Sequence, residues 1–359
     1  MPTISVVVPV RNEARSIEPT LRALLTQDFP PHEFEVIVAD GASTDDTVPI
    51  VRRLQGEFAN LKLVFNPGRL ASCGRNTAIR HATKDVVVIV DGHCHIPSRD
   101  YLQNVATAFA TSGADCLGRP QPLEIANATP FQQAVSLARS SPLGHNPDSD
   151  IYSHDAKFVA PQSTAVAYTR QVFHTIGLFD QAFDACEDVE FNERVHAAGF
   201  RCYFTPQVKV VYEPRRNFRA LFYQLSRYGR GRAKLAFKHP HSLTVPALVP
   251  PLWALWVLGG ASLGWVWPTV GGLWLASLAL YASVLMVAAG ILGWRKPAAV
   301  AVRIPGVFVA IHFGFAYGFW SEVVHQFRMR LWPRRGLMAQ RTLLRGQPTV
   351  DGHESRRTA

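Results

Sequence analysis

An uncharged apolar stretch constrains the fold of this chain more than any other feature of its sequence. The segment from Val245 to Trp294 contains no Asp, Glu, Lys or Arg. One membrane-spanning helix needs about 20 consecutive apolar residues. The stretch is therefore long enough to cross a bilayer twice, with a turn near Pro268, and we expect spans over about 245–267 and 269–294.

A third apolar segment, Ile304–Trp320, follows Arg295 and Lys296, which mark a cytoplasmic end. We expect a third span over about 302–320, which gives a transmembrane region over 245–322 and a basic, polar, flexible tail over 323–359. Three crossings would place four arginines outside, against the positive-inside rule. A re-entrant third segment therefore stays open as an alternative. These arginines are Arg328, Arg330, Arg334 and Arg335.

The positive charge of the chain is concentrated directly before the apolar stretch. The formal net charge is +10, and the segment Arg215–Lys238 contains eight basic residues and no acid. Aromatic and aliphatic residues recur there at helical spacing, so we predict a basic amphipathic helix over 214–240 that lies at a membrane interface. Because the charge adjoins the apolar stretch, we expect a membrane partner and no nucleic acid. Nucleic-acid binding stays as a weaker alternative.

Residues 1–213 alternate short β-branched runs with helical patterns, which predicts an α/β domain with a doubly wound sheet. Ligands of such sheets bind beyond the carboxyl ends of the strands. Asp40 and Asp91 each follow a predicted strand, so we expect both to face one crevice. Ser43 or Thr44 could cap the helix after the second strand. The predicted strands are Ile4–Val10, Phe34–Ala39, Leu61–Phe65 and Asp85–Val90.

The cysteines and the N-terminal segment indicate where the first half of the chain resides. Five cysteines, an odd number without a CxxC pair, favour a reducing compartment over a disulfide framework. Residues 1–10 lack a basic start and a signal-length apolar core. We therefore expect a multi-pass protein of the plasma membrane whose first half is cytoplasmic.

Two carboxylates at predicted strand ends could bind a ligand. Asp40, followed by Gly41, could accept a hydrogen bond from a nucleotide base, or could simply form an Asx-type turn. Asp91 and His93 are two residues apart on a turn and could share one divalent cation or one phosphate. The alternative is a polar strand end with a satisfied histidine.

Two further groups could act on a reacting hydroxyl or a phosphate. Glu187 and Asp188 open a helical pattern, where acids commonly stabilise a helix N-terminus, but a carboxylate there could also serve as a general base. Gln224 and Arg227 are three apart and share one face of the basic helix. Arg227 could pair with a diphosphate and Tyr228 could stack on a sugar, although the same surface could bind lipid headgroups.

Taken together, these motifs resemble an inverting family 2 glycosyltransferase with a GT-A nucleotide-diphospho-sugar transferase fold. The resemblance covers about the first 235 residues, and it is closest to the ExoA-like branch of succinoglycan biosynthesis. His93 stands where most relatives have a second Asp, and Tyr228-Gly229 replaces the Trp that ends a QxxRW element. The motifs that carry the resemblance are residues 7–13, residues 40–45, Arg75-Asn76, Asp91-Gly92-His93, Glu187-Asp188 and residues 224–229.

The resemblance implies a role for each motif. Asp188 would be the catalytic base, assisted by Glu187, and Asp40 would bind a uracil-type base. Asp91 and His93 would occupy the position of a divalent metal, Mg²⁺ or Mn²⁺, and the diphosphate. Pro9, Arg11, Glu13, Arg75 and Asp91 would contact the nucleotide sugar. Gln224, Arg227 and Tyr228 would lie near the acceptor and the diphosphate.

We therefore expect a membrane-anchored enzyme that transfers a hexose, glucose by resemblance, from a UDP-sugar to a lipid-linked saccharide or similar glycan acceptor in exopolysaccharide or cell-envelope synthesis. Two alternatives stay open. One is a processive polysaccharide synthase, which the replaced QxxRW tryptophan disfavours. The other is a non-catalytic membrane protein that binds a nucleotide sugar.

Overall fold

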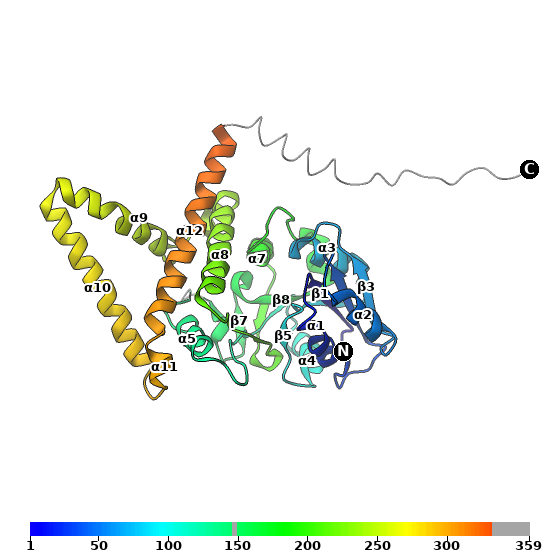
Figure 1. Cartoon of the computed structure of the whole chain (residues 1–359). Helices are drawn as coiled ribbons and strands as arrows, with labels where there is room; N and C mark the ends of the chain where they lie inside the picture. Colours follow the sequence, from blue (N-terminus) through cyan, green and yellow to red (C-terminus); the bar gives the residue numbers. More distant parts are fainter. Residues whose placement is uncertain (146–148, 332–359) are drawn as a thin grey trace, which may run out of the picture.

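A computed structural model describes residues 1–145 and 149–331, and Figure 1 shows its arrangement. The first part of the chain is built on one eight-stranded sheet with the order β3-β2-β1-β4-β8-β6-β9-β7. Its strands are β1 Ile4–Val10, β2 Phe34–Asp40, β3 Leu61–Phe65, β4 Val86–Ile89, β6 Cys116–Gly118, β7 Lys157–Val159, β8 Ala165–Thr169 and β9 Cys202–Phe204.

The first half of this sheet is parallel and the second half is mixed. Strands β1–β4 pair in parallel, as the alternating pattern predicts, and β8 inserts antiparallel to both β4 and β6. A separate two-stranded sheet joins β5 (Cys94–His95) to β10 (Val211–Tyr212). The predicted α/β class with a doubly wound mixed sheet is confirmed.

Helices cover both faces of the sheet. One face of β1, with Ile4, Val6 and Val8, is buried against α1, α2 and α4, whereas Val7 points to the face covered by α3, α6 and α7. This alternation follows from the period-2 geometry of a strand. The helices are α1 Ile17–Leu25, α2 Thr47–Gln55, α3 Ala71–His81, α4 Tyr101–Ser112, α6 Arg170–Ile176 and α7 Glu187–Ala197.

The remaining helices form a second layer beside the sheet domain (Figure 1). The basic helix α8 packs along α12, and α5 packs against both through one apolar cluster. Helices α9 and α10 form a hairpin that projects from this layer, away from the sheet (Figure 1). Their bounds are α5 Pro130–Arg139, α8 Phe218–Lys238, α9 Val245–Val266, α10 Pro268–Leu292, α11 Ala298–Ala301 and α12 Ile304–Leu331.

Three helical segments are long and apolar enough to cross a membrane: Val245–Val266, Pro268–Leu292 and Ala298–Leu331. The last helix continues to Leu331, past the end of the span predicted over 302–320, so the first residues of the predicted tail over 323–359 are helical. Residues 332–359 of that tail lie outside the described residues. The five cysteines are free and buried.

Candidate functional site

The carboxyl ends of β1 and β2 lie side by side at the candidate site. Asp40 pairs in register with Val10, and its side chain is buried. Its Oδ2 accepts a hydrogen bond from the Ser43 amide at 3.1 Å, which is the expected Asx-type turn. Its Oδ1 is buried and has no hydrogen-bond partner among residues 1–145 and 149–331. One oxygen therefore forms the turn, and the other can accept a hydrogen bond from a ligand.

The loops after β1 and β2 are joined by side-chain hydrogen bonds. The backbone N–H of Asn12 donates to Ser43 Oγ at 2.9 Å, and the backbone N–H of Thr44 donates to the side-chain Oδ1 of Asn12 at 2.8 Å. The expectation that Ser43 or Thr44 caps the next helix is therefore wrong. Helix α2 begins at Thr47 with Asp46 at its N-cap, because the two hydroxyl residues lie too early and bind the neighbouring loop instead.

The loop after β1 also reaches the turn that carries His93. Pro9 is half-buried at the end of β1 and Arg11 is exposed. Glu13 Oε1 lies 3.0 Å from His93 Nδ1. The hydrogen bond to Glu13, opposed by burial, raises the pKa of His93. The structure therefore joins two predicted site residues, Glu13 and His93, that are far apart in the sequence.

Asp91 lies where β4, β10 and α3 meet. Its Oδ2 accepts a hydrogen bond from the Tyr212 hydroxyl at 2.9 Å, and its Oδ1 is 3.5 Å from Arg75 Nη2. Burial alone would raise the pKa of Asp91, but the charges of Arg75 and then His93 outweigh it and hold the pKa below its usual value. Asp91 is therefore ionised at neutral pH, and 31% of its side chain is exposed.

Arg75 connects the two acidic motifs. This buried side chain of α3 also places Nη1 3.0 Å from Glu187 Oε1, and its guanidinium lies 5.4 Å from the centre of the Phe179 ring. Burial disfavours the cation, but the carboxylates of Glu187, Asp91 and Asp188 raise the pKa of Arg75 above its usual value. The Arg75 cation thus holds the carboxylate of Asp91, after a strand, near the carboxylate of Glu187, at the start of a helix.

The N-terminus of α7 presents two adjacent carboxylates in different environments. Cys186, the N-cap residue, has φ 60°, in the left-handed region that a non-glycine residue seldom adopts. Glu187 is buried, and burial together with the nearby Asp188 raises its pKa, although Arg75 opposes the shift. Asp188 is exposed, and among residues 1–145 and 149–331 it hydrogen-bonds only its own helix, through the backbone N–H of Val189 at 2.9 Å. Asp188 is therefore the carboxylate that an incoming group can reach.

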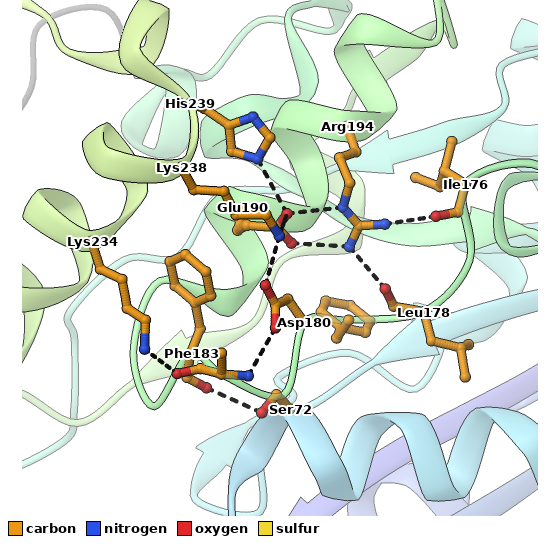
Figure 2. Close-up of polar contacts among 12 residues, drawn as sticks. Ser72, Ile176, Leu178, Asp180, Phe183, Glu190, Arg194, Lys234, Lys238 and His239 are labelled. Carbon is orange, nitrogen blue, oxygen red and sulfur yellow. Dashed lines mark hydrogen bonds and ion pairs between the residues drawn. The ribbon is translucent and has the colours of Figure 1, made fainter. Parts of the chain in front are cut away.

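Buried polar contacts fix the rest of α7. The Tyr168 hydroxyl donates to Asn192 Oδ1 at 2.7 Å. Glu190, whose side chain is fully buried, is paired with Arg194 at 2.9 Å and with Lys238 of α8 at 2.7 Å (Figure 2). These contacts hold the helix at its middle, so the position of its acidic first turn is defined by packing and not by a flexible loop.

Helix α8 passes directly over the segment that precedes Glu187. Arg227 Nη2 donates a hydrogen bond to the Asp184 carbonyl. A Cβ on Gly231 would lie 2.7 Å from the Ala185 carbonyl, so the helix and this segment are in backbone contact. Tyr228 is exposed on the same part of the helix, and Gln224 lies one turn earlier without a hydrogen bond to the other described residues. The structure therefore brings Arg227 and Tyr228 to the segment that precedes Glu187, whereas no such contact of Gln224 is found among the described residues.

Two residues at the site, Tyr212 and Arg119, were not singled out from the sequence, and a third, Arg215, was named only as the start of the basic segment. Tyr212 binds Asp91, and Arg119, which is 1% exposed, places Nη2 3.2 Å from the Ile89 carbonyl and 3.4 Å from the Tyr212 hydroxyl. Burial and then the nearby Arg227 cation lower the pKa of Arg215. An arginine directly after the apolar run Cys116–Gly118 was the available signal for Arg119. Tyr212 carries no such local signal, whereas Arg215 begins the basic segment.

The described residues offer few ligands for a metal ion. Within residues 1–145 and 149–331 there is no group of three or more His, Cys, Asp or Glu side chains arranged to hold one. Asp91 and His93 supply one carboxylate and one imidazole. A divalent ion here would need further oxygen ligands from a bound phosphate, as is common for Mg²⁺ in phosphate-binding sites.

A family model described as "Glycosyltransferase like family 2" matches residues 2–231. The chain is 31% identical over 334 residues to the succinoglycan biosynthesis protein ExoA of Rhizobium meliloti (strain 1021), covering 91% of this chain and 96% of that protein. It is 27% identical over 263 residues to glycosyltransferase AglE of Haloferax volcanii, covering 72% of this chain and 81% of that protein.

Solved structures share the fold. The mannosyltransferase PcManGT from Pyrobaculum calidifontis, in complex with GDP-Man and Mn²⁺, superimposes with a TM-score of 0.56 at 25% identity and covers 89% of this chain and 88% of its own. Staphylococcus aureus TarS 1–349 with UDP-GlcNAc gives a TM-score of 0.51 at 19% identity, with 89% of this chain and 91% of TarS 1–349 covered. The fold of the first part of this chain is thus the GT-A fold.

Proposed function

This chain belongs to glycosyltransferase family 2, and from that premise we propose that it is a membrane-anchored inverting enzyme. It transfers a hexose, glucose in our proposal, from a UDP-sugar to a hydroxyl of a lipid-linked saccharide or similar acceptor. The product serves exopolysaccharide or cell-envelope glycan synthesis. The relative named for succinoglycan biosynthesis, alike over nearly its whole length, supports this process.

The donor nucleotide lies at the ends of β1 and β2 in this proposal. The unpaired, buried Oδ1 of Asp40 is suited to accept a hydrogen bond from the N–H of a uracil-type base. Pro9 and Arg11 line the same edge, and Glu13 borders it through His93. The similar solved structures hold GDP-Man and UDP-GlcNAc, so the choice of UDP needs a direct test.

The residues around Asp91 fit a divalent cation that a donor diphosphate completes. Asp91 is ionised and partly exposed, and the Nδ1 contact with Glu13 leaves Nε2 of His93 available for a metal. Asp91 and His93 would hold Mg²⁺ or Mn²⁺, and the ion would neutralise the charge that develops on the departing diphosphate. The Mn²⁺ in the similar mannosyltransferase structure supports this assignment.

The protein's own residues orient the acceptor and the leaving group. Asp188 takes the proton from the acceptor hydroxyl as the oxygen attacks the anomeric carbon, on the face opposite the diphosphate, so that the configuration inverts. Glu187 is buried against Arg75 and holds the first turn of α7 in place. Arg227 and Tyr228 lie over this turn and contact the acceptor and the diphosphate. The carboxylate can take this proton because the hydroxyl becomes acidic as the bond forms.

The helices after the domain supply the membrane attachment. Helices α9 and α10 are long and apolar enough to cross a bilayer, and α8 carries basic side chains between them and the site. We place the catalytic domain on the cytoplasmic side of the plasma membrane, where a lipid-linked acceptor can reach Asp188 along α8.

One observation carries the proposal: Arg75 joins Asp91 and Glu187, so the strand-end acid and the acidic turn with Asp188 border one site. The test is a donor screen with purified full-length protein in detergent, in which release of UDP, GDP or TDP is measured with and without Mn²⁺ and with a lipid-linked saccharide extract. We expect UDP release that depends on metal and acceptor, with one sugar added. Release of GDP alone would overturn the choice of UDP, long polymer would favour a processive synthase, and binding without turnover would favour a non-catalytic protein.

A further inference from the structure

Helices α8 and α12 are packed so closely that their backbones touch. A Cβ on Gly229 of α8 would lie 1.9 Å from the Phe315 carbonyl oxygen of α12, and a Cβ on Gly318 would lie 1.8 Å from the Ser226 carbonyl oxygen. Further along, the Phe237 and Phe327 rings pack edge to face at 6.2 Å. The two helices therefore run parallel, side by side, over most of the length of α8.

The opposite side of α8 is attached to the catalytic domain by charged side chains. Arg230 lies 3.5 Å from a carboxylate oxygen of Asp184, Lys234 donates to the Ala182 carbonyl, and Lys238 lies 2.6 Å from Asp180. Figure 2 shows Lys234 and Lys238 at this contact, together with Asp180. From Arg227 to Lys238 these contacts extend over about 16 Å of helix.

This arrangement determines which part of α12 can lie in hydrocarbon. Between Gly318 and Phe327, only the width of α8 separates α12 from the charged side chains that attach α8 to the catalytic domain. Charged side chains and a polar domain surface are strongly unfavourable in a bilayer core. The first part of the helix, Ile304–Phe313, is about 15 Å long, only half of a hydrocarbon core that is about 30 Å thick.

Even this first part is covered by protein. Phe308 and Ile311 are buried in a cluster with Ala138 of α5, and His312 Nε2 is 2.8 Å from the Leu143 carbonyl oxygen. In the most apolar stretch of the segment Ala298–Leu331, 39% of the residues are buried inside the protein. The buried share of the corresponding stretch is 17% in α9 and 17% in α10. A larger share of α12 than of α9 or α10 is thus packed on the protein, whereas most side chains of α9 and α10 are free to face lipid.

We propose that α12 is not a third membrane span but a helix that lies at the cytoplasmic surface and fixes α8 to the membrane hairpin. This inference rests on the membrane attachment proposed above. Only α9 and α10 cross, as the projecting hairpin of Figure 1. Arg295 and Lys296 at one end of α12, and Arg328 and Arg330 at the other, then share the side of the catalytic domain, as the positive-inside rule requires.

Labelling of cysteines that are introduced one at a time into the full chain, in intact and permeabilised cells, tests this topology. The native cysteines are buried, so unmodified protein gives the background with a membrane-impermeant maleimide. The four labelling variants are Arg15→Cys in the catalytic domain, Thr269→Cys at the hairpin tip, Lys296→Cys and Arg328→Cys, all at exposed positions.

We expect Thr269→Cys to react in intact cells, and the other three variants to react only after permeabilisation. Reaction of Arg328→Cys in intact cells while Arg15→Cys stays protected would overturn the inference and restore three spans. Protection of Thr269→Cys in intact cells, when it reacts after permeabilisation, would overturn the crossing of the hairpin. Release of the wild type from membranes by sodium carbonate would instead overturn the membrane attachment itself. The four results therefore separate failure of the topology from failure of the proposed function.

Discussion

Arg75 and Glu187 form a buried ion pair at 3.0 Å, with only 9% of each side chain exposed. The pair joins α3 to the N-terminus of α7, more than a hundred residues later in the chain. Because the same guanidinium faces Asp91, one side chain sets the spacing between the two acidic motifs. The geometry of the site therefore depends on a residue that need not react.

Replacing Arg75 is expected to damage folding as well as activity. Arg75→Met leaves the buried Glu187 carboxylate without its cation, and removal of one partner of a buried pair costs about 3–5 kcal/mol. We expect a clearly lower unfolding midpoint for the protein in detergent, and Glu187→Gln should recover part of it in the double variant. An unchanged midpoint for Arg75→Met would show that the pair does not hold the site together.

Asp188→Asn should separate chemistry from binding. Asp188 is exposed, and in the described part of the chain it hydrogen-bonds only within its own helix, so the amide should leave the fold intact and remove the base. We expect kcat to fall by about 10²–10⁴-fold while calorimetry still detects the nucleotide sugar with a similar Kd. Asp28→Asn, on an exposed ion pair with Arg99, is the control and should keep full activity. Retained kcat in Asp188→Asn would exclude it as the base.

Much of the domain could be predicted because its signals are local. The strand Ile4–Val10 is predicted with the bounds observed, and Asp40 is the last residue of β2 while Asp91 follows β4, two strands of the same parallel half-sheet. The periodicity of α7 likewise places Glu187 and Asp188 in its first turn. Regular apolar spacing and sheet geometry are sufficient for these conclusions.

The rest depends on contacts between distant segments. Tyr212 reaches Asp91 only because β10 pairs with β5, and a two-residue strand has no recognisable pattern. The apolar composition of Ile304–Trp320 predicts a span, but it does not reveal that one side of this segment packs on α5 and α8. The composition of a segment shows how apolar it is, but it does not show whether lipid or protein covers it.

Acid should destabilise the protein through Glu190. Burial alone would raise the pKa of this carboxyl, but Arg194 and Lys238 bind the anion and lower the pKa below its usual value, with His239 also facing it (Figure 2). A lowered folded-state pKa stabilises the fold fully above the unfolded pKa of about 4.3, and this contribution is lost as the pH falls through the folded pKa.

Glu190→Gln tests this dependence. We expect the variant to unfold at a lower temperature than the wild type at pH 7, and the difference to shrink over the acid range, as the pH falls below the unfolded pKa of about 4.3 and through the lower folded-state pKa. Glu124→Gln, on an exposed pair with Lys209, should follow the wild type at every pH. A difference between Glu190→Gln and the wild type that stays constant over this range would mean that the carboxyl does not titrate with folding.

The contact of α8 with α12 should tolerate no side chain at Gly318. Gly318→Ala introduces a methyl group 1.8 Å from the Ser226 carbonyl, so the backbones must separate, and such overpacking costs about 1–3 kcal/mol. Gly306 lies in the same helix, and a methyl group added there would have no neighbouring atom within 4 Å. Gly306→Ala should therefore be neutral or slightly stabilising, because alanine is the better helix former.

Both variants are compared by thermal unfolding in detergent and by UDP release. Gly318→Ala should lower the midpoint and the activity together, since α8 carries Arg227 and Tyr228 over the first turn of α7. Equal midpoints for Gly318→Ala and Gly306→Ala would mean that the two helices are not in backbone contact. A lowered midpoint with full activity would mean instead that α8 keeps its position over the site without α12.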